Sequence, residues 1–124
     1  MRVRIRTAPP PGTMWGIYEH RLRLITLRPG MGKPQLISTL AHELGHAYYG
    51  HSGHHPKTER LADKWAARRL LSVDLIKDHS VQSMETTAIA ASIGVMPDVV
   101  QTFIDTLNFR QAVELMNYAA ELHT

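Results

Sequence analysis

Hydrophobic and polar residues alternate in short stretches at the start of the chain, as they do in half-buried strands. Residues 2–6 read RVRIR, and the proline-rich segment 8–12 then prevents this strand from continuing. The runs 14–18 (MWGIY) and 21–27 (RLRLITL) are separated by only two residues, a spacing that predicts a tight hairpin. We therefore expect a small N-terminal antiparallel sheet.

Farther along the chain the pattern becomes helical. Apolar residues recur at every third or fourth position between residues 34 and 49, which predicts a helix with a buried stripe made of Ile37, Leu40, Ala41, Leu44 and Tyr48. Loop and capping signals separate further helices, which we predict over residues 57–71, 81–93, from Pro97 onward, and from Asn108 to about 122.

The order of these elements indicates the fold class. Strands come first and helices follow, which favours an α+β fold with the sheet packed on helix 34–49 and a helical C-terminal half. A length of 124 residues suits one domain. We predict a single domain over 1–124, in which residues 1–80 hold the sheet and the metal-binding helices and residues 81–124 form a helical subdomain.

Composition narrows the possible chemistry. The chain has no cysteine, which excludes disulfide scaffolds, thiolate zinc fingers, iron–sulfur clusters and cysteine nucleophiles. Any metal must therefore be bound by His, Asp and Glu. No apolar run approaches the length of a membrane span, and the first residues lack the hydrophobic segment of a signal peptide. We expect a cytoplasmic protein with no membrane partner.

The charge is unevenly distributed. The net charge is +3, but residues 1–80 hold 13 of the 14 Lys and Arg and carry +7, whereas residues 81–124 carry −4. Segment 89–100 resembles the turn of a helix-turn-helix, which makes a DNA-binding regulator an alternative function. The predicted recognition helix from Pro97 contains two Asp and no Lys or Arg, so it would repel duplex DNA. We expect no direct contact with nucleic acid.

The apolar pattern of this acidic half favours packing. Apolar residues of the helix from Pro97 are spaced as a core stripe: Val99, Val100, Phe103, Ile104 and Leu107. We expect this half to pack against the first, or to dock a protein partner. The sequence does not indicate an oligomeric state.

The sequence HELGH at residues 42–46 matches the H-E-x-x-H pattern and lies in the predicted helix 34–49. His42 and His46 are one helical turn apart on the same face, so both imidazoles can bind one ion. Glu43 lies about 100° around the helix from His42. It can flank the metal without binding it and can take a proton from a water molecule on the metal. The apolar stripe faces away from His46, which leaves the histidine pair outside the core.

The next predicted helix carries two acids on its packed side. Glu59 and Asp63 share a face with Ala62 and Ala66. Because burying unpaired carboxylates is costly, they should bind a cation or accept strong hydrogen bonds. The small alanines would let the two helices approach closely, which makes Glu59 the predicted third ligand. Asp63 could then accept the outer N–H of His42 and fix its tautomer.

Three nearby histidines are other candidates for the third ligand: His51, His54 and His55. The longer pattern H-E-x-x-H-x-x-G-x-x-H is not met, because Tyr49 and Ser52 stand where it needs Gly and His. The three could still line the cleft or polarise a substrate carbonyl.

Two segments, TLAHELGHAYYGH (39–51) and ERLADKWAARRLL (59–71), resemble the ImmA/IrrE metallopeptidases of phages, prophages and bacterial mobile elements. The likeness extends over residues 15–72. It implies that His42, His46 and Glu59 bind Zn²⁺ and that Glu43 is the catalytic carboxylate. It also implies a protein substrate, a helix-turn-helix repressor whose cleavage switches on phage or stress genes.

The resulting hypothesis is a zinc-dependent endopeptidase with water as the fourth ligand of zinc. An extended substrate would pair with an edge strand of the sheet, either 14–18 or 21–27. A zinc-binding sensor that cleaves nothing is a further alternative, because such a protein would keep the same residues.

Overall fold

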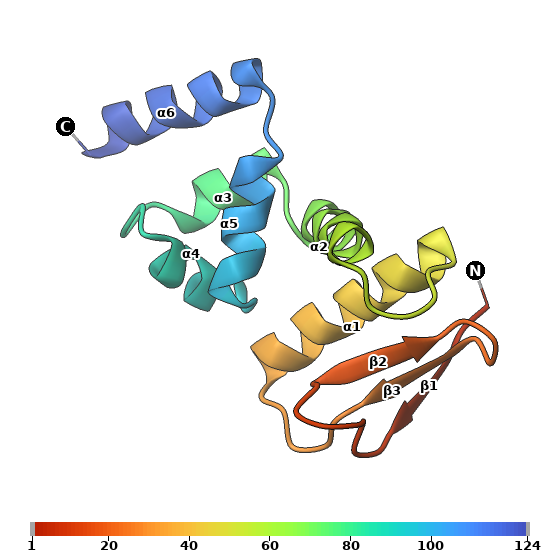
Figure 1. The fold of residues 1–124 in the computed structure, drawn as a ribbon. Helices are drawn as coiled ribbons and strands as arrows, with labels where there is room; N and C mark the ends of the chain where they lie inside the picture. The colour runs from red at the N-terminus through yellow and green to blue at the C-terminus, as the bar shows by residue number, and fades with distance from the viewer. Residues whose placement is uncertain (1, 124) are drawn as a thin grey trace.

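The structure is a computed structural model that describes residues 2–123. Figure 1 shows three layers: a small sheet lies on one side of helix α1, helix α2 lies on the other, and the remaining helices follow beyond α2. The elements in chain order are β1 (Arg4–Thr7), β2 (Gly16–Glu19), β3 (Leu24–Leu27), α1 (Lys33–Tyr49), α2 (Pro56–Leu70), α3 (Val73–His79), α4 (Thr86–Ile93), α5 (Pro97–Asp105) and α6 (Phe109–His123). The α+β class is confirmed.

The sheet is mixed, so the prediction of an antiparallel sheet was wrong for one strand. The strand order is β1-β3-β2, with β2 antiparallel and β1 parallel to β3. The proline-rich connection after β1 is too long and too irregular for a hairpin, so β1 pairs with the far edge of β3. As a result β3 is central, and only β2 and β1 have free edges.

The hairpin turn is longer than the sequence pattern predicted. Residues 20–23 form the turn, with Arg23 in the left-handed region at φ 48°, and β3 begins only at Leu24. The run RLRLITL is therefore half turn and half strand. Arg28, just after β3, donates hydrogen bonds to the backbone carbonyls of Met14 (2.7 Å) and Gly12 (2.8 Å) and so holds the segment before β2 in place.

Helix α1 is buried on two sides rather than one. Tyr18, Ile25 and Leu27 of the sheet form a small core with Ala47, while α2 covers the opposite side. The prediction that the ligand face lies outside the core was wrong, because α2 leaves His46 only 4% exposed. Tyr48, predicted in the buried stripe, is 56% exposed, because its ring lies beside Trp65 of α2 at the surface rather than in the core that Ala47 shares with the sheet.

The helices after α2 differ in part from the prediction. A short helix, α3, was missed; the Ser72 side chain caps it by accepting a hydrogen bond from the Leu75 N–H. The predicted helix 81–93 begins at residue 86. The prediction that the C-terminal half packs on the first half is confirmed, since α2–α6 share one core whose fully buried members are Ala67, Ile76, Ile89, Ala90 and Val100.

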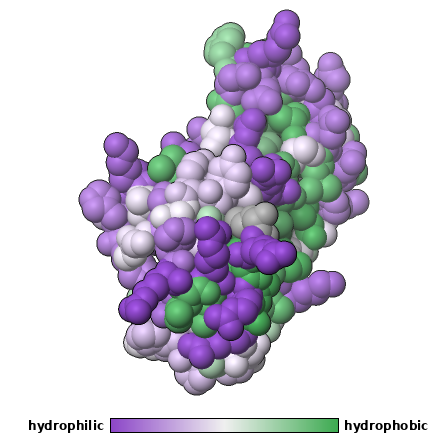
Figure 2. Space-filling model, turned by 90° about the vertical axis from the view of Figure 1, so that its right-hand side faces the viewer, coloured by the Kyte–Doolittle hydropathy of each residue, from purple (hydrophilic) through white to green (hydrophobic). Residues whose placement is uncertain are grey.

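Two further observations concern the surface. Among the described residues, no helix alone is both long and apolar enough to cross a membrane, and only the bent pair α4 and α5 passes that test together. On the face drawn in Figure 2, hydrophobic patches lie between strongly hydrophilic side chains. Part of the apolar surface thus stays uncovered; its largest exposed members include Trp15, Tyr48, Tyr49, Phe109 and Met116.

Candidate metal centre

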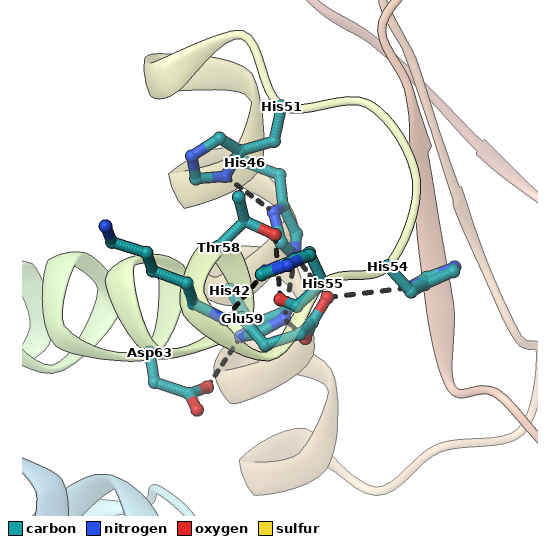
Figure 3. A network of polar contacts seen from close by, with 9 residues as sticks. His42, His46, His51, His54, His55, Thr58, Glu59 and Asp63 are labelled. Atoms are coloured by element: carbon teal, nitrogen blue, oxygen red, sulfur yellow. Dashed lines mark hydrogen bonds and ion pairs between the residues drawn. The ribbon is translucent and has the colours of Figure 1, made fainter.

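Helices α1 and α2 pack side by side, and their contact brings the predicted ligands together. Gly45 makes this contact possible, since a Cβ there would lie 2.9 Å from the backbone oxygen and 3.0 Å from the Cα of Ala62. His42 and His46 project from α1 toward α2, and Glu59 reaches them from the first turn of α2 (Figure 3). That turn is fixed by Pro56 and by the His55 ring, which accepts a hydrogen bond from the Lys57 N–H.

Three side chains converge on one point (Figure 3). The Nε2 atoms of His42 and His46 are 3.1 Å apart and lie 2.8 Å and 2.9 Å from the two oxygens of the Glu59 carboxylate. Zinc bonds of about 2.0–2.1 Å in a tetrahedron place ligand atoms about 3.3 Å apart. The observed separations are a few tenths of an ångström shorter, so small side-chain movements would admit the ion. Two imidazoles and a carboxylate are also a donor set that suits zinc.

Each histidine of this trio has a partner on its outer nitrogen. The Nδ1 atom of His42 lies 2.7 Å from Oδ1 of Asp63, and Nδ1 of His46 lies 3.0 Å from Nδ1 of His51. Such outer partners orient a ligating imidazole and fix which nitrogen faces the metal. The structure thus places Asp63 beside His42, where the sequence predicted it, and adds His51, whose role the sequence analysis left open.

Burial and neighbouring charges shift the pKa of each of the three side chains that converge here. Burial by itself would lower the pKa of His42, but the hydrogen bond to Asp63 and the nearby carboxylates outweigh it and raise the pKa to about 9. Burial and the positive charge of His42 lower the pKa of His46. Burial would raise the pKa of Glu59, but the two histidines outweigh it and lower the pKa. Without a metal, a proton on His42 therefore supplies the positive charge at this point.

Glu43 is the buried carboxylate of the site. It is 6% exposed, and burial raises its pKa to about 7 against the opposing effect of His42. The backbone N–H of Tyr18 on β2 donates a hydrogen bond to this carboxylate. Glu43 can therefore both accept and release a proton near neutral pH, as a general base and acid must.

A cleft of about 400 Å³ opens beside these residues. His42, Glu43 and Glu59 line it together with Trp15 and Gly16 from the start of β2. Its far wall comes from the C-terminal half through Met96, Asp98, Val99 and Thr102. Sequence reasoning missed this wall, since no local pattern near Pro97 indicates which part of the fold α5 will meet.

The three neighbouring histidines have three different positions. His51 contacts His46 because Gly50, at φ 69°, ends α1 and turns the chain back so that the His51 N–H donates to the His46 carbonyl at 2.9 Å. His54 is half exposed and lines the cleft, with Nδ1 3.4 Å from Oε1 of Glu59. His55 caps α2. The spacing of five residues between His46 and His51, followed across a glycine helix end, is the signal that could have identified His51.

The chain matches no family model, no curated protein and no solved structure.

Proposed function

We propose that this chain is a zinc-dependent endopeptidase. The observation that carries the proposal is the convergence of the His42 and His46 Nε2 atoms with the Glu59 carboxylate, beside a cleft lined by the buried carboxylate of Glu43. Ligand roles for His42, His46 and Glu59 account for the convergence of two imidazole nitrogens and a carboxylate on one point.

The residues of the site have different roles in this reaction. When bound, zinc would lower the pKa of a coordinated water and polarise the scissile carbonyl. Glu43 takes a proton from the attacking water and later delivers it to the leaving amine. Asp63 holds the His42 ring, and His51 holds the His46 ring, in orientations that would direct both Nε2 atoms toward a bound ion. His54, on the wall of the cleft, is a candidate to donate a hydrogen bond to the developing oxyanion.

The free edge of β2 supplies a place for an extended peptide. The Arg28 N–H donates to the Trp15 carbonyl at 2.8 Å, so residues 15 and 28 form a hydrogen-bonded pair of the hairpin. Hydrogen-bonded pairs alternate along an antiparallel ladder, which leaves the peptide groups of Gly16 facing the open edge. Because Gly16 also lines the cleft, a peptide that pairs there passes the metal centre. The other strand considered for this role, 21–27, is excluded because β3 is central.

The resemblance to ImmA/IrrE peptidases supports a helix-turn-helix repressor as the substrate. The alternative in which this chain itself binds DNA through α4 and α5 is less well supported. The two helices do meet at 112°, a helix-turn-helix angle. However, Val100 and Phe103 of α5 are buried in the core, and Asp98 and Val99 face the cleft.

The test combines metal content with cleavage. We expect the wild type and Glu43→Gln to bind one zinc ion per chain, and His46→Ala to bind none. A repressor encoded by a neighbouring reading frame, incubated with the wild type, should yield two fragments in a mass spectrum, whereas Glu43→Gln should be about 10²- to 10⁴-fold slower.

The outcomes separate the alternatives. Zinc binding without cleavage, identical in the wild type and Glu43→Gln, would favour the sensor. Absence of stoichiometric zinc would overturn the metal centre itself. A gel shift of duplex DNA at low salt would favour the DNA-binding regulator.

A further inference from the structure

A second cluster of side chains lies outside the metal cleft, on the outer side of α1 and α2. Tyr48 and Tyr49, at the end of α1, are 56% and 45% exposed. The Tyr48 ring lies 5.5 Å from the Trp65 ring of α2, and the Tyr49 ring is stacked on His51 at 5.2 Å. Two neighbouring turns of α2 add three cations. We call this cluster the aromatic–basic patch; its members are Tyr48, Tyr49, Lys64, Trp65, Arg68 and Arg69.

The cations surround the aromatic rings. A hollow in the surface is lined by Tyr49 and Trp65 together with Lys64, Arg68 and Arg69, and none of its lining residues is acidic. The Arg69 guanidinium lies 5.0 Å above the Trp65 ring, and Arg68 lies 6.0 Å from the Phe103 ring. Among the described residues, no ion pair involves any of these three cations. Their charges are therefore available to an anionic ligand.

Tyr48 and Tyr49 are exposed and Trp65 is only partly buried, although burying these rings would stabilise the fold. The chain has eight aromatic residues, and three of them are in this patch. Apolar rings gain free energy when they leave water, and contiguous exposed patches of this kind mark binding surfaces. A ligand for this surface must offer flat apolar faces to the rings and negative charge to the cations.

We propose that the aromatic–basic patch binds single-stranded nucleic acid. Bases stack on exposed aromatic side chains, and phosphates meet Lys and Arg nearby, which is how sequence-tolerant single-strand sites are built. Duplex DNA hides its base faces, and an acidic peptide has charge but no comparable flat faces. The inference does not depend on zinc, since no member of the patch lines the metal cleft. It differs from our expectation of no nucleic-acid contact, which was based on the acidic C-terminal half.

The first experiment measures binding of the full-length chain to fluorescein-labelled 15-nucleotide oligo-dT and oligo-U by fluorescence anisotropy. We expect both to bind at 50 mM salt, and the exposed double variant Tyr48→Ala/Tyr49→Ala to bind about 10-fold or more weakly. Removing two cations in Lys64→Gln/Arg69→Gln should reduce the slope of log affinity against log salt concentration by about 1.4. The control Arg21→Gln/Arg23→Gln removes the same charge from the exposed hairpin turn and should leave affinity nearly unchanged.

A second readout reports stacking directly. In Trp15→Phe, Trp65 is the only tryptophan, and added oligo-dT should quench its fluorescence. Comparison with a duplex of equal length and with a poly-glutamate peptide identifies the ligand class. The proposal is overturned if the oligonucleotides do not bind, if the control variant weakens binding as much as the patch variants do, or if duplex DNA or poly-glutamate binds equally well with no effect of the tyrosine changes.

Discussion

The sheet and α1 share a small hydrophobic core, whereas α2–α6 share a larger one, and the metal centre lies between the two at the contact of α1 with α2. The larger core consists of fully buried aliphatic side chains such as Ile76, Ile89 and Val100. The region around the metal centre instead buries polar groups, among them Glu43 and His46 at 6% and 4% exposure. The residues that stabilise the fold and the residues that carry the chemistry thus lie in different layers.

Burying the ionisable groups of the metal centre is unfavourable by itself. Buried ionisable groups lose hydration that neighbouring charges must replace, whereas buried aliphatic groups gain free energy directly. We therefore expect the helical core to dominate the free energy of unfolding and the metal centre to depend on its ion. Four predictions test this division.

The largest effect is expected in the helical core. Ile76→Ala removes a fully buried side chain of α3 and should lower the free energy of unfolding by about 2–5 kcal/mol. Urea denaturation measures this change. Zinc stoichiometry at a temperature where the variant is folded should stay the same, because α3 does not touch the site. Val81→Ala, at a position that is 50% exposed, is the control and should change stability by about 0.5 kcal/mol or less. Loss of zinc from folded Ile76→Ala would contradict the separation of the stabilising helical core from the metal centre.

The next effect concerns the contact between α1 and α2. A methyl group at Gly45 would press on backbone atoms of Ala62, which cannot move alone, so Gly45→Ala should cost about 1–3 kcal/mol although alanine favours a helix by about 1 kcal/mol. We expect weaker zinc binding as well, measured by competition with a chelator. Gly32→Ala is the matched control, since its Cβ would meet no atom within 4 Å. Unchanged zinc affinity in Gly45→Ala would show that the ligands do not need the close approach.

A smaller effect is expected at the partner of His42. Asp63→Asn keeps the shape of the side chain but removes its charge, and it should weaken zinc binding by about 10- to 100-fold. Isothermal titration calorimetry measures the affinity. Asp98→Asn, which changes another cleft carboxylate without a contact to a ligand, is the control. Equal losses in both variants would mean that only the overall charge of the cleft matters.

The smallest effect is a dependence of stability on pH in a chelator. The pKa of His42 is raised to about 9 by the fold, so between pH 7 and 9 the folded chain binds more protons than the unfolded one. Stability contributed by this proton is complete below about pH 6.5 and falls as the pH rises, by about 1 kcal/mol per pH unit or less. Urea denaturation at pH 7, 8 and 9 should show this fall, and His42→Ala should flatten it. A rise in the free energy of unfolding of the wild type between pH 7 and 9 would contradict the positive charge assigned to His42.

The sequence could predict the parts of this protein that depend on local spacing. Two histidines four residues apart share a helix face whatever surrounds the helix, and the same holds for Glu59 and Asp63 one turn apart on α2. Alternation and turn residues likewise predicted strands before helices. These features follow from backbone geometry that each segment carries within itself.

The sequence predictions that were wrong share one cause. The pairing of β1 with β3, the exposure of Tyr48 and the burial of His46 depend on which element lies beside another. Periodicity shows that a helix has an apolar face, but it does not show that α1 is covered from two sides or which side chains of its last turn stay exposed.

Local patterns, then, were sufficient for the residue types and helix faces of the candidate metal centre, because the helix repeat is the same in every environment. Only packing decided that α5 lines the cleft, that His51 contacts His46 and that two exposed tyrosines and the partly buried Trp65 share one surface patch with three cations. Those contacts join residues from different elements, and their free energy depends on burial and distance in the assembled fold.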